Sequence, residues 1–182
     1  MTQTTTQSHY PNLSTHEEIV SRTLSVIVDN EPGVLARVIG LFSGRGYNID
    51  SLTVTETEHE KHISRITIAT KGTPMVIEQI KHQLERLVPV HRVHDLTETG
   101  QPLERELALV KVQGKGEKRI EALRMAEIFR AEVIDASTEH FVFEFSARSS
   151  KVDQFISIMN ELGLVEVART GIAAIARGRG LV

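Results

Sequence analysis

Cysteine and tryptophan are absent from this chain of 182 residues, and aromatic residues make up only 4% of it. The lack of thiols excludes disulfide scaffolds, thiolate zinc sites, iron–sulfur clusters and cysteine nucleophiles. It fits a reducing compartment, so we expect a cytoplasmic protein. No apolar run approaches the roughly 20 residues that span a bilayer, and we expect no membrane association. Residues 1–9 have neither a basic start nor an apolar stretch, which argues against a secretory signal.

An excess of charge of one sign is also missing, because 24 acidic residues stand against 21 basic ones. Binding to nucleic acid requires a basic excess that neutralises phosphates, so we expect no nucleic-acid partner. With 40% hydrophobic and 25% charged residues, the composition is that of an ordinary folded protein. At roughly 150 residues per domain, the length fits one large domain or two small ones.

Residues 1–21 show no hydrophobic periodicity and predict a flexible N-terminal arm. A first unit, 22–96, follows, in which alternating apolar residues predict strands and apolar residues three and four apart predict helices. The expected elements are a strand at 24–28, a helix at 34–42 ended by Gly44 and Gly46, strands at 47–56 and 63–70, a helix at 74–87 and a strand at 88–96. Pro32 is expected near the first helical position, where its missing N–H is harmless.

The polar stretch 97–104, with Gly100 and Pro102, predicts a linker. The order of elements then repeats in a second unit, 105–182. Its expected elements are a strand at 107–112, a helix at 118–130, strands at 133–136 and 141–145, a helix at 152–162, and a last strand at 164–168 that 172–175 extends.

Both units therefore have the order β-α-β-β-α-β, which is the split βαβ arrangement of ferredoxin-like domains. We predict an α+β protein of two tandem ferredoxin-like units, each a four-stranded antiparallel sheet with two helices on one face. The other face of each sheet must be solvated or covered by a partner. Units of about 75 residues bury limited apolar area alone, so a homodimer is expected.

Catalytic motifs are missing from the sequence, which contains no dinucleotide fingerprint, Walker loop or nucleophile elbow. His59 and His62, like His91 and His94, are three residues apart, a spacing that metal sites use. The first pair spans a predicted turn and the second points to opposite faces of a strand, so no metal site is expected. Three carboxylates along one strand and its turn are expected to face water: Asp50, Glu56 and Glu58.

The turn from Asn30 to Gly33 is the best candidate for a binding site. It joins a strand to a helix N-terminus, where free N–H groups and the helix dipole suit a small carboxylate. Gly33 has no Cβ, so a ligand can approach the backbone, and Asn30 offers both a donor and an acceptor. These groups suit a zwitterion, with Val34, Leu35 and Leu52 as an apolar wall. The alternative is a helix cap without a ligand, and the residues alone favour it.

The segment Asn30-Glu31-Pro32-Gly33-Val34-Leu35-Ala36-Arg37-Val38 closely resembles the regulatory small subunits of acetolactate synthase (acetohydroxyacid synthase). The likeness begins at Thr23 and continues through 40–49, 51–54, 106–112 and 166–171. It covers nearly the whole chain from Arg22 to Gly180. The first unit in particular resembles an ACT domain, a module that senses amino acids.

This resemblance implies a chain that is not an enzyme on its own. In the family, a separate catalytic large subunit holds thiamine diphosphate, magnesium and FAD, and condenses two pyruvates, or pyruvate with 2-ketobutyrate. These steps lie on the route to valine, leucine and isoleucine. The small subunit raises that activity and confers feedback inhibition, usually by L-valine bound between two ACT domains of a homodimer. The resemblance therefore implies no cofactor in this chain, and a second unit that contacts the catalytic subunit.

The resemblance also implies which residues bind the effector amino acid. One protomer contributes the turn Asn30, Glu31, Pro32 and Gly33, with Val34, Leu35 and Ala36 beside it, and the other protomer contributes Asn48 and Ile49. A second interpretation is a free-standing, amino-acid-responsive regulator of another enzyme or of transcription. The preferred branched-chain amino acid and any influence of a nucleotide are left open by the sequence.

Overall fold

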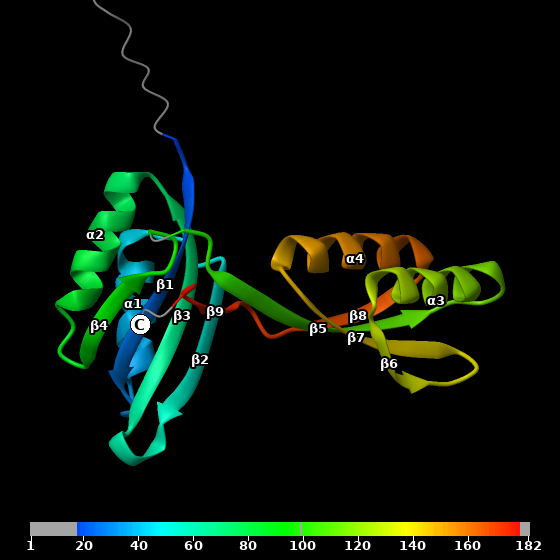
Figure 1. Cartoon of the computed structure of the whole chain (residues 1–182), viewed down its shortest axis with the longest axis horizontal. Helices are drawn as coiled ribbons and strands as arrows, with labels where there is room; N and C mark the ends of the chain where they lie inside the picture. Colours follow the sequence, from blue (N-terminus) through cyan, green and yellow to red (C-terminus); the bar gives the residue numbers. More distant parts are fainter. Residues whose placement is uncertain (1–17, 99, 179–182) are drawn as a thin grey trace, which may run out of the picture.

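The computed structural model describes residues 18–98 and 100–178, which form two units joined side by side (Figure 1). The first unit contains β1 (Val20–Asp29), α1 (Val34–Arg45), β2 (Ser51–Glu58), a 3-10 turn η1 (His59–Lys61), β3 (Ile63–Gly72), α2 (Pro74–Glu85) and β4 (Val90–Asp95). Its antiparallel sheet has the order β2-β3-β1-β4. This is the predicted βαββαβ unit.

The second unit repeats this arrangement. It contains β5 (Leu103–Gln113), α3 (Glu117–Phe129), β6 (Glu132–Ala136), β7 (His140–Ala147), α4 (Ser149–Leu162) and β8 (Leu164–Arg169), with the strand order β6-β7-β5-β8. A short last strand, β9 (Ala173–Ile175), pairs with the first residues of β5. The α+β fold with two ferredoxin-like units is confirmed.

Each hydrophobic core lies between one sheet and its two helices. In the first unit, Leu24, Val26 and Val28 alternate along β1 and pack against the buried faces of α1 and α2. In the second, Phe141, Phe143 and Phe145 alternate along β7 in the same way, and the rings of Phe143 and Phe145 contact Phe155 of α4. The periodicity of these residues therefore places the helices on one face of each sheet.

The opposite face of the first sheet is partly covered by the chain itself. Ser25 is fully buried and Thr67 is 4% exposed, although both side chains point away from the helices. The start of β5 and the strand β9 lie across this face, and Thr23 Oγ1 donates a hydrogen bond of 2.7 Å to Glu104. The long strand β5 thus begins on the first unit and ends in the second (Figure 1).

Several predicted boundaries differ from the structure. β1 begins at Val20, within the predicted arm 1–21, because Val20 and Ser21 already pair with β3; residues 1–17 lie outside the described residues. β5 begins at Leu103, inside the predicted linker 97–104. β2 begins at Ser51 rather than at residue 47, because Gly46 ends α1 in the left-handed conformation and a loop follows.

The predicted extension of the last strand by residues 172–175 is wrong. Gly171 has φ +83°, which turns the chain after β8, and β9 pairs instead with the start of β5, on the first unit. The expected position of Pro32 is also wrong, because α1 begins at Val34 with Gly33 as its N-cap. Pro32 therefore precedes the cap and belongs to the turn before the helix.

Candidate functional site

The turn between β1 and α1 has the geometry of a type II β-turn. Val34 N donates to Glu31 O at 3.3 Å, and Gly33 has φ 87° and ψ −7°, the values of the third turn residue. Pro32 occupies the second position, which it favours in this turn. Only glycine adopts the Gly33 conformation without strain. No atom lies within 4 Å of an ideal Cβ at Gly33, so the space above the turn is open.

The N-terminus of α1 leaves two donors free beside this turn. The N–H groups of Leu35 and Ala36 have no hydrogen-bond partner within the described part of the chain. The first turn of the helix contains no acidic side chain, and Gly33 supplies no side-chain cap. Because α1 spans 12 residues, its dipole adds to these donors. The helix start is therefore suited to a carboxylate.

Asn30 is held in a defined orientation by the next hairpin. Its N–H group donates to His62 O at 2.6 Å, and its side-chain Nδ2 donates to Glu56 Oε1 at 3.1 Å. His59 Nδ1 lies 2.6 Å from the other oxygen of Glu56. These hydrogen bonds, the one from His59 first, lower the pKa of the Glu56 carboxyl, which keeps it charged. Since Nδ2 faces Glu56, Asn30 Oδ1 is left as an acceptor.

The other two predicted site residues lie in the loop between α1 and β2. The Asn48 carbonyl accepts a hydrogen bond of 2.6 Å from Thr70 Oγ1, and Asn48 Nδ2 donates to Asp50 Oδ1 at 2.6 Å. Asp50 is paired in turn with Lys71 at 3.0 Å. Ile49 is half-buried and packs on the first core. The Asn48 side chain is therefore exposed on a loop that is connected to β3 through Thr70 and Lys71.

The two loops lie at opposite ends of the first unit. On β3 their neighbours, Ile63 and Ala69, are six residues apart, which corresponds to about 20 Å of extended strand. The structure thus brings 30–36 together and keeps Asn48 and Ile49 away from them within one chain. One amino acid can touch both loops only if they come from two chains. Which residues bind an effector stays a prediction.

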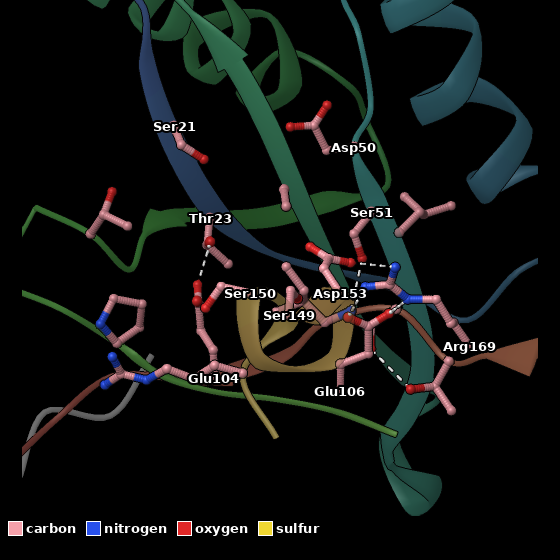
Figure 2. A pocket seen from close by; sticks show the side chains of 18 of the residues that line it. Ser21, Thr23, Asp50, Ser51, Glu104, Glu106, Ser149, Ser150, Asp153 and Arg169 are labelled. Atoms are coloured by element: carbon pink, nitrogen blue, oxygen red, sulfur yellow. Dashed lines mark hydrogen bonds and ion pairs between the residues drawn. The ribbon is translucent and has the colours of Figure 1, made fainter. Parts of the chain in front are cut away.

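A cleft of about 900 Å3 separates the two units, and no sequence pattern predicts it (Figure 2). Asp50 and Ser51 lie on its first-unit wall, and the start of α4 lies on the other. Between them Arg169 makes two hydrogen bonds of 2.7 Å to Glu106, which is 4% exposed, and a third to Asp153. The Arg169 guanidinium holds the pKa of the Glu106 carboxyl below its ordinary value.

The histidine pairs are not arranged as metal ligands. His59 is bound to Glu56, and His91 Nε2 lies 2.6 Å from Asp29. Within residues 18–98 and 100–178, no three His, Cys, Asp or Glu residues are grouped to hold a metal ion. No helix in the same described ranges is long and apolar enough to cross a membrane.

A Ser–His–Asp constellation occurs at the β6–β7 hairpin, where His140 bridges Ser137 at 2.8 Å and Asp135 at 2.9 Å. Ser137 Oγ also accepts hydrogen bonds from the backbone N–H groups of Glu139 and His140, as in a side-chain-capped turn. The serine oxygen therefore closes the hairpin, and we assign it no nucleophilic role.

Comparison with known proteins agrees with this two-unit architecture. A family model described as the AHAS small subunit-like ACT domain matches residues 24–92, and one described as the small subunit of acetolactate synthase matches residues 105–178. The chain is 46% identical over 158 residues to the acetolactate synthase isozyme 3 small subunit of Escherichia coli, covering 86% of this chain and 96% of that one.

Two further relatives cover similar ranges. The probable acetolactate synthase small subunit of Archaeoglobus fulgidus is 44% identical over 159 residues, covering 87% of this chain and 98% of the relative. The crystal structure of the acetolactate synthase small subunit from Thermotoga maritima superposes with a TM-score of 0.79 at 40% identity, covering 88% of this chain and 99% of the other.

Proposed function

Because this chain belongs to the family of acetolactate synthase small subunits, we propose that it regulates the catalytic subunit through an amino acid bound between two copies of its ACT domain. The effector is a branched-chain amino acid, L-valine in the first place. The observation that carries the proposal is the free helix start beside Asn30 in a domain that matches an AHAS small subunit-like ACT domain.

The chemistry of the turn fits the two charged groups of an amino acid. The effector carboxylate accepts from the N–H groups of Leu35 and Ala36, at the positive end of the α1 dipole. The effector ammonium donates to Asn30 Oδ1, which the hydrogen bond to Glu56 leaves free. The open space above Gly33 admits the backbone of the ligand. Val34 and Leu35 border the turn on the apolar side.

A second copy of the chain completes the site. Leu35 and Ile39 on the outer side of α1 are 38% and 39% exposed, which leaves apolar surface at this edge of the unit. A two-fold axis beside α1 sets the helices of two copies antiparallel. The turn at Asn30 in one copy then faces Asn48 and Ile49 of the other, so each homodimer holds two equivalent effector sites.

Regulation follows if the effector binds one activity state of the complex more tightly than the other. The catalytic subunit carries thiamine diphosphate, magnesium and FAD, and the present chain supplies only the sensing site and contacts to that subunit, including those of the second unit. Pocket size discriminates weakly between similar side chains, at roughly 1–3 kcal/mol per methylene. L-Leucine is therefore expected to bind less tightly than L-valine without being excluded.

A free-standing amino-acid-responsive regulator is the alternative function. The relatives that match nearly the whole chain are acetolactate synthase small subunits, which favours the regulatory subunit. The four helices of the described residues all pack on the two sheets, so none of them is left over for a DNA-binding helix pair.

The proposal is tested by calorimetric titration of the purified chain and of its complex with the catalytic subunit. L-Valine is expected to bind once per protomer and to inhibit acetolactate formation, and L-alanine serves as the control. Activity of the catalytic subunit is expected to rise when the small subunit is added. Absence of L-valine binding in both the free chain and the complex would refute the proposal.

A further inference from the structure

Four consecutive residues, 169–172, join the second unit to strand β2 of the first. Arg169 is bound to Glu106 on β5 and to Asp153 on α4. Thr170 exchanges backbone and side-chain hydrogen bonds with Leu107 of β5. This half of the segment is thereby fixed to the second unit.

The other half of the segment is bound to β2. Ile172 N–H donates to Ser51 Oγ at 2.8 Å, and the Ile172 carbonyl accepts from Thr53 Oγ1 at 3.0 Å. Both backbone groups of Ile172 are thus satisfied by side-chain hydroxyls of a single strand. Ser51 lies on the wall of the cleft close to Arg169 (Figure 2).

Gly171 shows how closely the two units approach at this junction. Its φ of +83° lies in the left-handed region, and an ideal Cβ there would lie 2.8 Å from Ser51 Oγ and 3.1 Å from Thr53 Cγ2. A side chain at this position would therefore be strained by the backbone conformation and would displace the Ser51 hydroxyl. The contact between β2 and residues 170–172 is a packed junction in the described structure, at one end of an otherwise open cleft of about 900 Å3.

This junction lies next to the predicted effector site. Ser51 follows Asn48 by three residues, and the N–H group of the intervening Asp50 donates a hydrogen bond of 2.8 Å to Ala69 O on β3. Strand β2 is an edge strand of the first sheet, so within the described residues only β3 holds it in the sheet by backbone pairing. A displacement of Asn48 reaches Ser51 over about 10 Å of extended chain.

We infer that Ser51 and Thr53 are positioning residues that transmit occupancy of the effector site to the second unit through their hydrogen bonds to Ile172. The inference rests on the proposed function, because it requires that an amino acid bind near Asn48. In this arrangement the effector moves the start of β2, the hydroxyls move Ile172, and Arg169 carries the change to β5 and α4. The cleft provides the space in which the two units change their relative position.

The test separates effector binding from inhibition in the complex with the catalytic subunit. The double variant Ser51→Ala/Thr53→Val removes both hydroxyls with little change of volume. We expect its Kd for L-valine, from calorimetry, to stay within threefold of wild type, and its activation of the catalytic subunit without L-valine to stay within twofold. Inhibition at saturating L-valine is expected to fall below half of the wild-type value.

Two further variants serve as matched controls. Thr55→Val changes the next residue on the same face of β2, which makes no hydrogen bond to residues 170–172, and is expected to keep full inhibition. Thr53→Ser keeps a hydroxyl at the junction and is expected to retain inhibition as well. Thr55→Val makes the same exchange of a hydroxyl for a methyl group as Thr53→Val, and valine favours strands as threonine does, so an effect of that exchange unrelated to Ile172 would appear in this control as well.

Three results would overturn the inference. Inhibition above half of the wild-type value in the double variant would show that the junction transmits nothing. A Kd weakened more than threefold would place Ser51 and Thr53 in effector binding, and activation lowered more than twofold would show a general structural role. Failure of the wild-type chain to bind L-valine would instead refute the proposed function, and the wild-type titration reveals this before any variant is compared.

Discussion

Replacing Asn30 by alanine tests the proposed effector site at the residue assigned as the acceptor for the effector ammonium. The side chain is exposed, and its one hydrogen bond within the described structure runs to Glu56 at 3.1 Å. An exposed bond of this kind contributes less than about 1 kcal/mol, so the fold is expected to survive. The same amide is the proposed acceptor for the effector ammonium. A hydrogen bond to a charged group contributes about 1.5–3 kcal/mol, which corresponds to a Kd roughly 10- to 140-fold weaker.

The assay is a calorimetric titration with L-valine, repeated as inhibition of the reconstituted synthase. Because the coupling free energy between effector and activity is unchanged by Asn30→Ala, the midpoint of inhibition is expected to shift by the same factor as Kd. Asn160→Ala, at an exposed position on α4, is the matched control and is expected to leave both values unchanged. A Kd within threefold of wild type for Asn30→Ala would refute the assignment of the ammonium acceptor.

Two predictions concern stability, measured by thermal and pH-dependent unfolding. An ideal Cβ at Gly163, which has φ +109°, lies 2.1 Å from Gln113 O, so Gly163→Ala is expected to lower the free energy of unfolding by about 3 kcal/mol or more. Gly100→Ala is the control: Gly100 has φ +124° but lies in open space, so this variant is expected to lose only the smaller free energy that the strained backbone conformation costs. Arg169 lowers the pKa of Glu106 below 4.5, so this pair stabilises the fold above pH 4.5 and its contribution is lost as pH falls through the lowered value. Glu106→Gln is expected to lower the free energy of unfolding by about 2 kcal/mol at pH 7, a moderate value because Arg169 is partly solvated. The difference in this free energy between the variant and wild type is expected to shrink below pH 4.5. A difference that stays constant with pH would contradict this prediction.

The order of helices and strands could be predicted because local periodicity determines it. Phe141, Phe143 and Phe145 occupy every second position in the sequence, and in β7 all three side chains accordingly face the core. Helix α3 has no clear apolar stripe, since only Ala122 and Ala126 are buried on it. It could still be predicted, because its residues have a high intrinsic propensity for helix.

Contacts between distant segments could not be predicted. The turn chemistry of Glu31-Pro32-Gly33 is local and visible in the sequence, but Glu56, which orients Asn30, is 26 residues away. Ser51 and Thr53 resemble ordinary strand residues, and only the tertiary structure shows that their hydroxyls form hydrogen bonds with Ile172. Polar partners of this kind depend on the tertiary arrangement, for which hydrophobic periodicity carries no signal.

The proposed site between two chains would also explain how a small ligand can control a large partner. An effector that binds only one state stabilises it by about 2.7 kcal/mol at 100 times its Kd. One such site shifts an equilibrium roughly 100-fold, whereas changing the populations from 1:99 to 99:1 requires about 5.5 kcal/mol. Two equivalent sites in one homodimer together reach about 5.4 kcal/mol, provided that both act on the same conformational change. A two-fold dimer that couples both junctions to one catalytic partner meets that condition, and a monomeric sensor with the same affinity does not.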